Sequence, residues 1–120
     1  MMRILAVDDS ASMREMVRIA LTGAGFDVTA AIDGHDALAI ARQMDFDLVL
    51  SDVNMPRMDG ISLIRALRAE TAYRHTPILM LTTESSPERK RAGKEAGATG
   101  WIVKPFDPPQ LIATMQRVLR

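Results

Sequence analysis

The sequence contains no cysteine, and its formal net charge is zero. Without cysteine the chain has no disulfide, no thiolate metal site and no cysteine nucleophile, which fits a cytoplasmic protein. The balanced charge argues against a general nucleic-acid or membrane-surface binder, because such proteins usually carry a clear positive excess. The longest uninterrupted apolar run has five residues, Ala37 to Ala41, far below the ~20 that a membrane-spanning helix needs. We therefore predict a cytoplasmic protein that neither inserts into a membrane nor binds nucleic acid.

The chain has 120 residues, of which 48% are hydrophobic and 25% charged. This length and composition are typical of one globular domain. The zero net charge hides an asymmetry, since residues 1–60 carry ten acidic and five basic side chains while residues 61–120 carry five acidic and ten basic ones. Acidic chemistry is therefore concentrated in the first half. No linker or repeat is visible, so we expect a single domain over residues 1–120 with no output domain.

Five short apolar runs alternate with segments of helical periodicity. Continuous apolar runs indicate strands that are buried on both faces, as in parallel sheets covered by helices. We therefore predict an α/β fold, a (βα)5 doubly wound parallel sheet. The predicted strands are Ile4–Val7, Val28–Ala31, Leu48–Leu50, Pro77–Leu81 and Trp101–Val103, and the predicted helices are Ser12–Ala24, Gly34–Met44, Ile61–Ala69, one from Ser85 or Ser86 to Gly97, and a last one that carries Leu111, Met115 and Leu119 behind Pro108 and Pro109.

One helix start carries a specific signal. Ser12 and Glu15 have the spacing of a capping box, in which each side chain bonds the other's main-chain N–H. Gly23 and Gly25 follow as stop signals.

Polar side chains follow the predicted strands where each strand ends. Asp8 and Asp9 follow the first strand, Asp52 the third, Thr82 the fourth and Lys104 the fifth. Because ligands of open α/β sheets bind beyond the carboxyl ends of the strands, we expect these side chains to share one site.

Three carboxylates in one site repel one another unless a cation shares it. With so few protein ligands, octahedral Mg²⁺ fits better than Ca²⁺. A metal, a lysine and a hydroxyl around one carboxylate form a site for a phosphoryl group, and a carboxylate nucleophile there would give an aspartyl phosphate. Each feature alone has an ordinary interpretation: paired aspartates cap helices, Thr82 bonds the local backbone, and Lys104 is a solvated lysine. The combination favours the phosphoryl site.

Four motifs carry a resemblance to a known family: VDDS at 7–10, SDVNMPRMDG at 51–60, LTTES at 81–85 and KPF at 104–106. With these motifs the whole chain resembles the receiver domains of two-component response regulators, most closely those of single-domain chemotaxis regulators. The resemblance implies the flavodoxin-like strand order 2-1-3-4-5.

The resemblance also implies residue roles. Asp52 is implied to be the phosphate acceptor, and Asp8 and Asp9 to position Mg²⁺ together with the backbone carbonyl of Asn54. The remaining implied roles are Thr82 as the switch hydroxyl, Lys104 as the lysine that binds a phosphoryl oxygen, Asn54 and Glu84 as residues that tune dephosphorylation, and Pro105 as a cis-proline.

Two positions depart from the family pattern. Trp101 stands where a tyrosine or phenylalanine usually turns inward on activation, and Thr83 stands where a small residue is common. We expect Trp101 to act as the aromatic switch, the alternative being a fixed aromatic side chain at the sheet edge. Thr83 would crowd its inward path or narrow access for the phosphodonor.

The function implied by the resemblance is a signalling switch and not an enzyme in its own right. A sensor histidine kinase would phosphorylate Asp52, and the monomer would then bind a target such as the flagellar motor switch protein, with a short-lived phosphoform that a phosphatase partner could also reset. A phosphate sink and a regulator of another target, such as pilus motility, remain alternatives. A phosphatase with an aspartate nucleophile is more remote, because Asn54 could not serve as its general acid or base. The basic run of Arg89, Lys90, Arg91 and Lys94 is either a solvated helix face or a docking patch for an acidic segment.

Overall fold

Five parallel strands form one sheet in the order β2-β1-β3-β4-β5. The computed structural model describes residues 1–55, 57–83 and 87–119. The strands are β1 (Arg3–Val7), β2 (Asp27–Ala31), β3 (Leu48–Asp52), β4 (Ile78–Thr82) and β5 (Gly100–Val103). The helices are α1 (Ala11–Gly23), α2 (Gly34–Gln43), α3 (Gly60–Ala69), the short η1 (Thr71–Tyr73), α4 (Pro87–Ala96) and α5 (Pro108–Val118).

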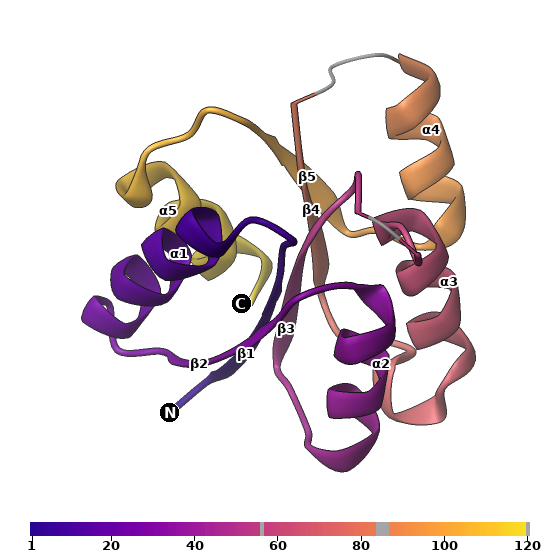
Figure 1. The fold of residues 1–120 in the computed structure, drawn as a ribbon, viewed down its shortest axis with the longest axis horizontal. Helices are drawn as coiled ribbons and strands as arrows, with labels where there is room; N and C mark the ends of the chain where they lie inside the picture. The colour runs from indigo at the N-terminus through magenta and orange to yellow at the C-terminus, as the bar shows by residue number, and fades with distance from the viewer. Residues whose placement is uncertain (56, 84–86, 120) are drawn as a thin grey trace.

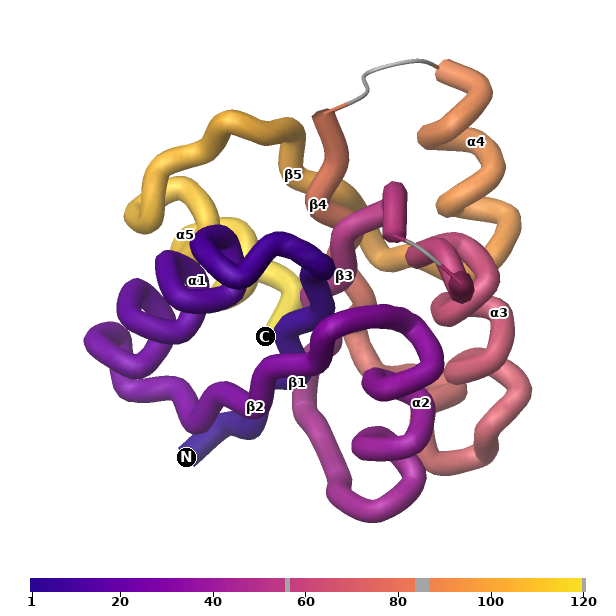
Figure 2. Tube along the Cα trace, viewed as in Figure 1, coloured from indigo at the N-terminus to yellow at the C-terminus, as the bar shows by residue number. Residues whose placement is uncertain are grey.

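The sheet lies between two helical layers. Helices α1 and α5 cover one face, and α2, α3 and α4 cover the other (Figures 1 and 2). In β1, Ile4 and Ala6 belong to the hydrophobic cluster that includes α1 and α5, whereas Leu5 and Val7 belong to the cluster on the opposite face. Successive side chains of a strand point to opposite faces, so a strand that is apolar throughout supplies both layers. The predicted fold class and strand order are confirmed.

All five predicted strands are present, with bounds that differ by no more than two residues. The predicted capping box at the first helix is wrong. Ser10 is the N-cap of α1, and its Oγ accepts a hydrogen bond from the N–H of Met13 at 3.3 Å. Glu15 instead forms an ion pair with Arg18 one turn along. Ser12, the residue that the sequence favoured as the cap, lies inside the helix, because the main chain turns two residues earlier at Ser10.

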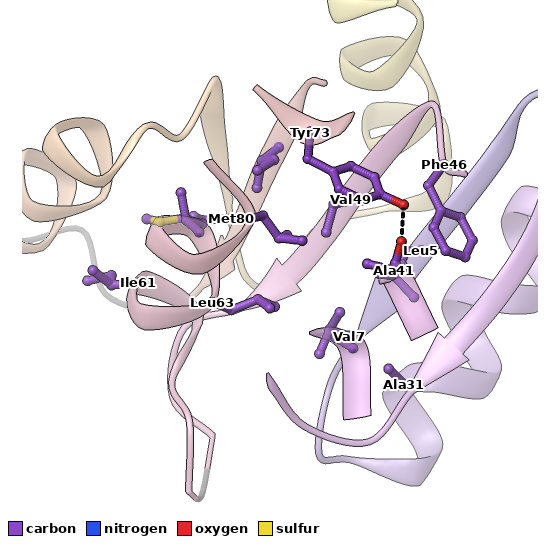
Figure 3. Close-up of a cluster of buried hydrophobic side chains, with 14 of the residues drawn as sticks. Leu5, Val7, Ala31, Ala41, Phe46, Val49, Ile61, Leu63, Tyr73 and Met80 are labelled. Carbon is purple, nitrogen blue, oxygen red and sulfur yellow. Dashed lines mark hydrogen bonds between the residues drawn. The ribbon is translucent and has the colours of Figure 1, made fainter. Parts of the chain in front are cut away.

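The tyrosine of η1 ties α3 and its following turn to the end of α2. The Tyr73 hydroxyl lies 2.6 Å from the carbonyl oxygen of Ala41 and 2.5 Å from that of Met44. Figure 3 shows this hydroxyl pointing at Ala41 from within the buried cluster. It provides a donor for carbonyls that a helix C-terminus leaves without intrahelical partners.

Helix α4 differs from the others in what it buries. Its buried residues are Gly93 and Ala96, so it contributes no large side chain to the core. A Cβ at Gly93 would lie 2.5 Å from the terminal carbon of Met80, which shows how closely the helix approaches β4. Gly97 directly follows the helix, and its φ of +113° suits glycine. The predicted cap at Ser85 or Ser86 falls outside the described residues.

The sequence predicts that Pro108 and Pro109 precede the last helix. In the structure both lie in the first turn of α5. Proline is favourable there because the first turn leaves its N–H groups unpaired in any case. Within the described ranges, no helix has the length and apolar character needed to cross a membrane.

Candidate phosphoryl and metal site

Three carboxylates meet at the carboxyl edge of the sheet. Asp8 and Asp9 follow β1, and Asp52 is the last residue of β3. One carboxylate oxygen from each lies within 4.8 Å of those from the other two. Asp8 and Asp52 are buried, whereas Asp9 is exposed, so the cluster opens to solvent on one side.

Lys104 is the first residue after β5, and its side chain contacts this cluster. Its Nζ lies 3.2 Å from Oδ2 of Asp8 and 3.3 Å from Oδ1 of Asp52. All three side chains are at most 13% exposed, so water screens these ion pairs only weakly. The peptide bond from Lys104 to Pro105 is cis.

The Asp52 carboxyl is held by its own strand end and perturbed by its neighbours. Its Oδ1 accepts a hydrogen bond from the N–H of Val53 at 2.9 Å. Burial raises the pKa of Asp52 above its usual value, Lys104 lowers it in part, and the charge on Asp8 raises it further. The site therefore disfavours the charge that a carboxylate nucleophile needs unless a further cation is supplied.

The donor set fits a hard divalent cation. Carboxylate oxygens are the ligands that Mg²⁺ prefers, and it commonly retains several waters when few protein ligands are present. Because Asp9 is exposed, solvent water reaches the cluster on that side. A cation here would also offset the mutual repulsion of three carboxylates.

Thr82 ends β4 at the same edge. Its position in the sheet is one residue beyond Leu81, which pairs with Asp52 in the strand register. The residue is buried, and its carbonyl oxygen accepts a hydrogen bond from the N–H of Lys104 at 2.7 Å. Thr83, by contrast, is exposed.

Trp101 lies on β5 with its side chain 36% exposed. The ammonium of Lys90, on α4, lies 5.3 Å from the centre of its ring. This distance is within the range of a cation–π interaction. The structure therefore places the indole on the outer surface beside α4.

The basic run of α4 divides into two pairs. Arg89 and Lys90 are half-buried, and Arg91 and Lys94 are exposed. Arg89 donates a hydrogen bond to the side-chain oxygen of Asn54 at 3.2 Å, which links α4 to the segment after β3. Glu84 lies outside the described residues.

The sequence did not point to an ion pair between Arg57 and Asp33, which joins the segment after β3 to the start of α2. Asp33 is buried and precedes α2, and Arg57 lies in the segment between β3 and α3. The two residues are 24 positions apart, and neither belongs to a motif that marks the other. His35 and His75 are exposed and lie outside the acidic cluster.

Comparison with known proteins agrees with this geometry. The family model described as "Response regulator receiver domain" matches residues 4–116. The chain is 41% identical to chemotaxis protein CheY-3 of Vibrio cholerae, covering 98% of this chain and 91% of that protein. It is 44% identical to the DNA-binding response regulator MtrA of Mycobacterium leprae over 98% of this chain and 51% of MtrA. The chain thus spans about half the length of some curated relatives that it matches.

Two solved structures are similar over almost the whole chain. The chemotaxis protein CheY4 of Vibrio cholerae has a TM-score of 0.96 and 55% identity, with 98% of each chain covered. The receiver domain of a sensor histidine kinase from Pseudomonas aeruginosa has a TM-score of 0.92 and 30% identity, with 98% of this chain and 97% of that one covered. The latter structure has a magnesium ion coordinated in its active-site cleft.

Proposed function

Since the chain belongs to the response regulator receiver family, we propose that it is a phosphorylation-driven signalling switch whose phosphate acceptor is Asp52. The observation that carries this proposal is the arrangement around one buried carboxylate. Two further carboxylates lie within 4.8 Å of it and a lysine ammonium lies 3.3 Å from it. A nucleophilic carboxylate, a cation site and a fixed positive charge are the components that phosphoryl transfer to a side chain requires.

The phosphoryl donor would be a phosphohistidine of a sensor histidine kinase. The P–N bond of the donor breaks as a P–O bond forms to a carboxylate oxygen of Asp52, and the histidine leaves with the electron pair of the broken bond. Asp8, Asp9, Asp52 and the backbone carbonyl of Asn54 would hold Mg²⁺, which when bound neutralises charge on the transferring group.

The chain's own side chains would then respond to the new charge. Lys104 is already 3.3 Å from Asp52, so it is placed to pair with an oxygen of the phosphoryl group. Thr82 is buried at the end of the neighbouring strand, and its hydroxyl would donate a hydrogen bond to another oxygen of the phosphoryl group. The movement of Thr82 would leave space into which Trp101 turns from its outer position, changing the surface formed by α4, β5 and α5. Asn54 and Glu84 would set how fast water removes the phosphoryl group.

The chemotaxis proteins among its relatives favour the flagellar motor switch protein as the target. The alternatives are a phosphate sink and a regulator of pilus motility, neither of which would bind a motor-switch peptide. A pull-down with that peptide, with and without phosphorylation, separates them from the proposed function. We expect capture of the phosphorylated monomer only. The cytoplasmic location expected from the sequence stays a prediction.

The first experiment is intact mass after incubation with acetyl phosphate and Mg²⁺, while the fluorescence of Trp101 is followed. We expect the wild type to gain one phosphoryl group with a fluorescence change, and Asp52→Asn to gain none. Asp27→Asn, which alters an exposed carboxylate on β2, is the matched control and should behave as the wild type. A wild type that gains no phosphoryl group, or an Asp52→Asn variant that gains one, would contradict the proposal. A phosphoryl gain with unchanged fluorescence would reject only the part assigned to Trp101.

A further inference from the structure

The segment between Asp52 and α3 contains a strained residue. Arg57 has a φ of +67° and is the one non-glycine residue with positive φ among those the structure describes. A left-handed main-chain conformation is unfavourable for any residue that has a Cβ. It persists where surrounding contacts enforce it. The contact that involves the Arg57 side chain is the ion pair with Asp33.

That ion pair joins an exposed arginine to a buried carboxylate. The Arg57 Nε lies 3.1 Å from Oδ2 of Asp33, and a second guanidinium nitrogen contacts the same oxygen. The other oxygen of Asp33 accepts a hydrogen bond from the N–H of Asp36 at 2.8 Å, which caps α2. The Arg57 guanidinium and the Asp36 N–H together hold the pKa of Asp33 below its ordinary value. Asp33 is thus fixed to α2, and Arg57 is fixed to Asp33.

Two close approaches hold the same segment on either side of Arg57. A Cβ on Gly34 would lie 2.7 Å from the carbonyl oxygen of Met58, so the start of α2 packs directly against the segment. A Cβ on Gly60 would lie 2.3 Å from the carbonyl oxygen of Asp52, and the Gly60 N–H bonds the carbonyl of Val53 at 2.9 Å. Val53 is therefore held by Gly60, and Met58, which directly follows Arg57, is held by the start of α2.

We propose that Arg57 is a positioning residue, whose ion pair with Asp33 holds the segment after Asp52 in the conformation that binds a divalent cation at Asp8, Asp9 and Asp52. The proposal rests on the proposed function, because it concerns the same cation site. Arg57 does not touch the cluster itself. It acts through the main chain that carries Asn54, and residues that orient metal ligands in this indirect way typically change metal affinity by about 10- to 100-fold.

The test is the dissociation constant for Mg²⁺, measured by calorimetry on the full chain. Arg57→Gly removes the ion pair while suiting the positive φ, and Asp33→Asn removes the pair while keeping a side-chain oxygen for the α2 cap. We expect each to weaken Mg²⁺ binding about tenfold, and the double variant to be no weaker than either, because both remove one interaction. Arg57→Lys, which keeps a positive charge, should stay closer to the wild type than Arg57→Gly.

The matched control is Arg42→Gln, which breaks another arginine–carboxylate pair, that with Glu70, at the carboxyl ends of α2 and α3. It should bind Mg²⁺ as the wild type does. Circular dichroism is used to check that each variant is folded. If Arg57→Gly does not fold, the Mg²⁺ affinity of Asp33→Asn is the test. If the wild type binds Mg²⁺ and both single variants bind it equally well, the role of Arg57 is refuted and the proposed function stands. If the wild type itself binds no Mg²⁺, both are refuted.

Discussion

Replacing Asp52 with asparagine is expected to stabilise the metal-free protein at neutral pH. Asp52 is buried and its pKa is raised above the ordinary value, first by burial, with Lys104 opposing and Asp8 adding to the shift. A carboxyl group whose pKa is higher in the folded state than in the unfolded chain lowers stability once pH passes above the unfolded value. The loss is complete above the folded pKa and absent well below the unfolded one.

The magnitude follows from the charges around the group. With an effective dielectric constant of about 20, the repulsion from Asp8 at no more than 4.8 Å is at least ~3.5 kcal/mol, and the attraction to Lys104 at 3.3 Å is ~5 kcal/mol. The exposed Asp9 adds about 1 kcal/mol because water screens it. These charge interactions nearly cancel. The cost of burying the ionised carboxylate therefore decides whether its removal stabilises or destabilises the fold. We expect Asp52→Asn to raise the free energy of unfolding by about 1–2 kcal/mol, a fraction of that burial cost.

The assay is urea denaturation in EDTA at pH 7 and again near pH 4, with the same measurements in saturating Mg²⁺. The gain should shrink toward pH 4, where the wild-type carboxyl is increasingly protonated. Mg²⁺ should stabilise the wild type more than the variant, because the variant offers one carboxylate fewer. Asp27→Asn should change neither curve appreciably. An Asp52→Asn variant that is less stable than the wild type in EDTA at pH 7 would refute the reasoning.

Three further substitutions test other features. Gly60→Ala would place a Cβ 2.3 Å from the Asp52 carbonyl oxygen, so we expect a loss of about 1–3 kcal/mol in urea denaturation and slower phosphorylation. Tyr73→Phe removes the donor to two carbonyls at the end of α2 and should cost about 1–2 kcal/mol, with phosphorylation unchanged. Lys90→Met removes the cation 5.3 Å from the indole, so the emission of Trp101 should change in the unphosphorylated protein.

Each of these has an outcome that would count against it. Wild-type stability in Gly60→Ala would mean that the strand end moves aside freely. If Tyr73→Phe also lowers the rate of phosphorylation, the end of α2 is coupled to the phosphoryl site, contrary to the prediction. Unchanged emission in Lys90→Met, with Arg91→Met as the matched substitution, would show that the cation does not act on the indole.

The fold and the acidic cluster could be predicted from the sequence because both follow from short-range patterns. An apolar run followed by an aspartate specifies a buried strand and its end, and parallel strands bring their ends to one edge. Asp8, Asp9, Asp52 and Lys104 meet there for that reason. The helix start at Ser10 was missed because Ser12 also satisfies a capping pattern, and the choice depends on where the main chain turns.

Contacts between side chains on different loops could not be predicted. Arg57 and Asp33 meet because α2 packs against the segment before α3, and this packing depends on the absence of a Cβ at Gly34. The bond from Arg89 to Asn54 likewise depends on the placement of α4 against the sheet. Neither pair has a local spacing that marks it.

The small side chains that α4 buries determine how readily this helix separates from the rest of the domain. Apolar burial contributes about 25 cal/mol per Å², and Gly93 and Ala96 offer little area compared with the leucines and isoleucines that α3 buries. The free energy needed to open α4 locally should therefore be lower than that for α3. Its amide hydrogens are expected to exchange with solvent sooner than those of α3 in the native protein. A helix held this weakly can take up a new position at the cost of few contacts.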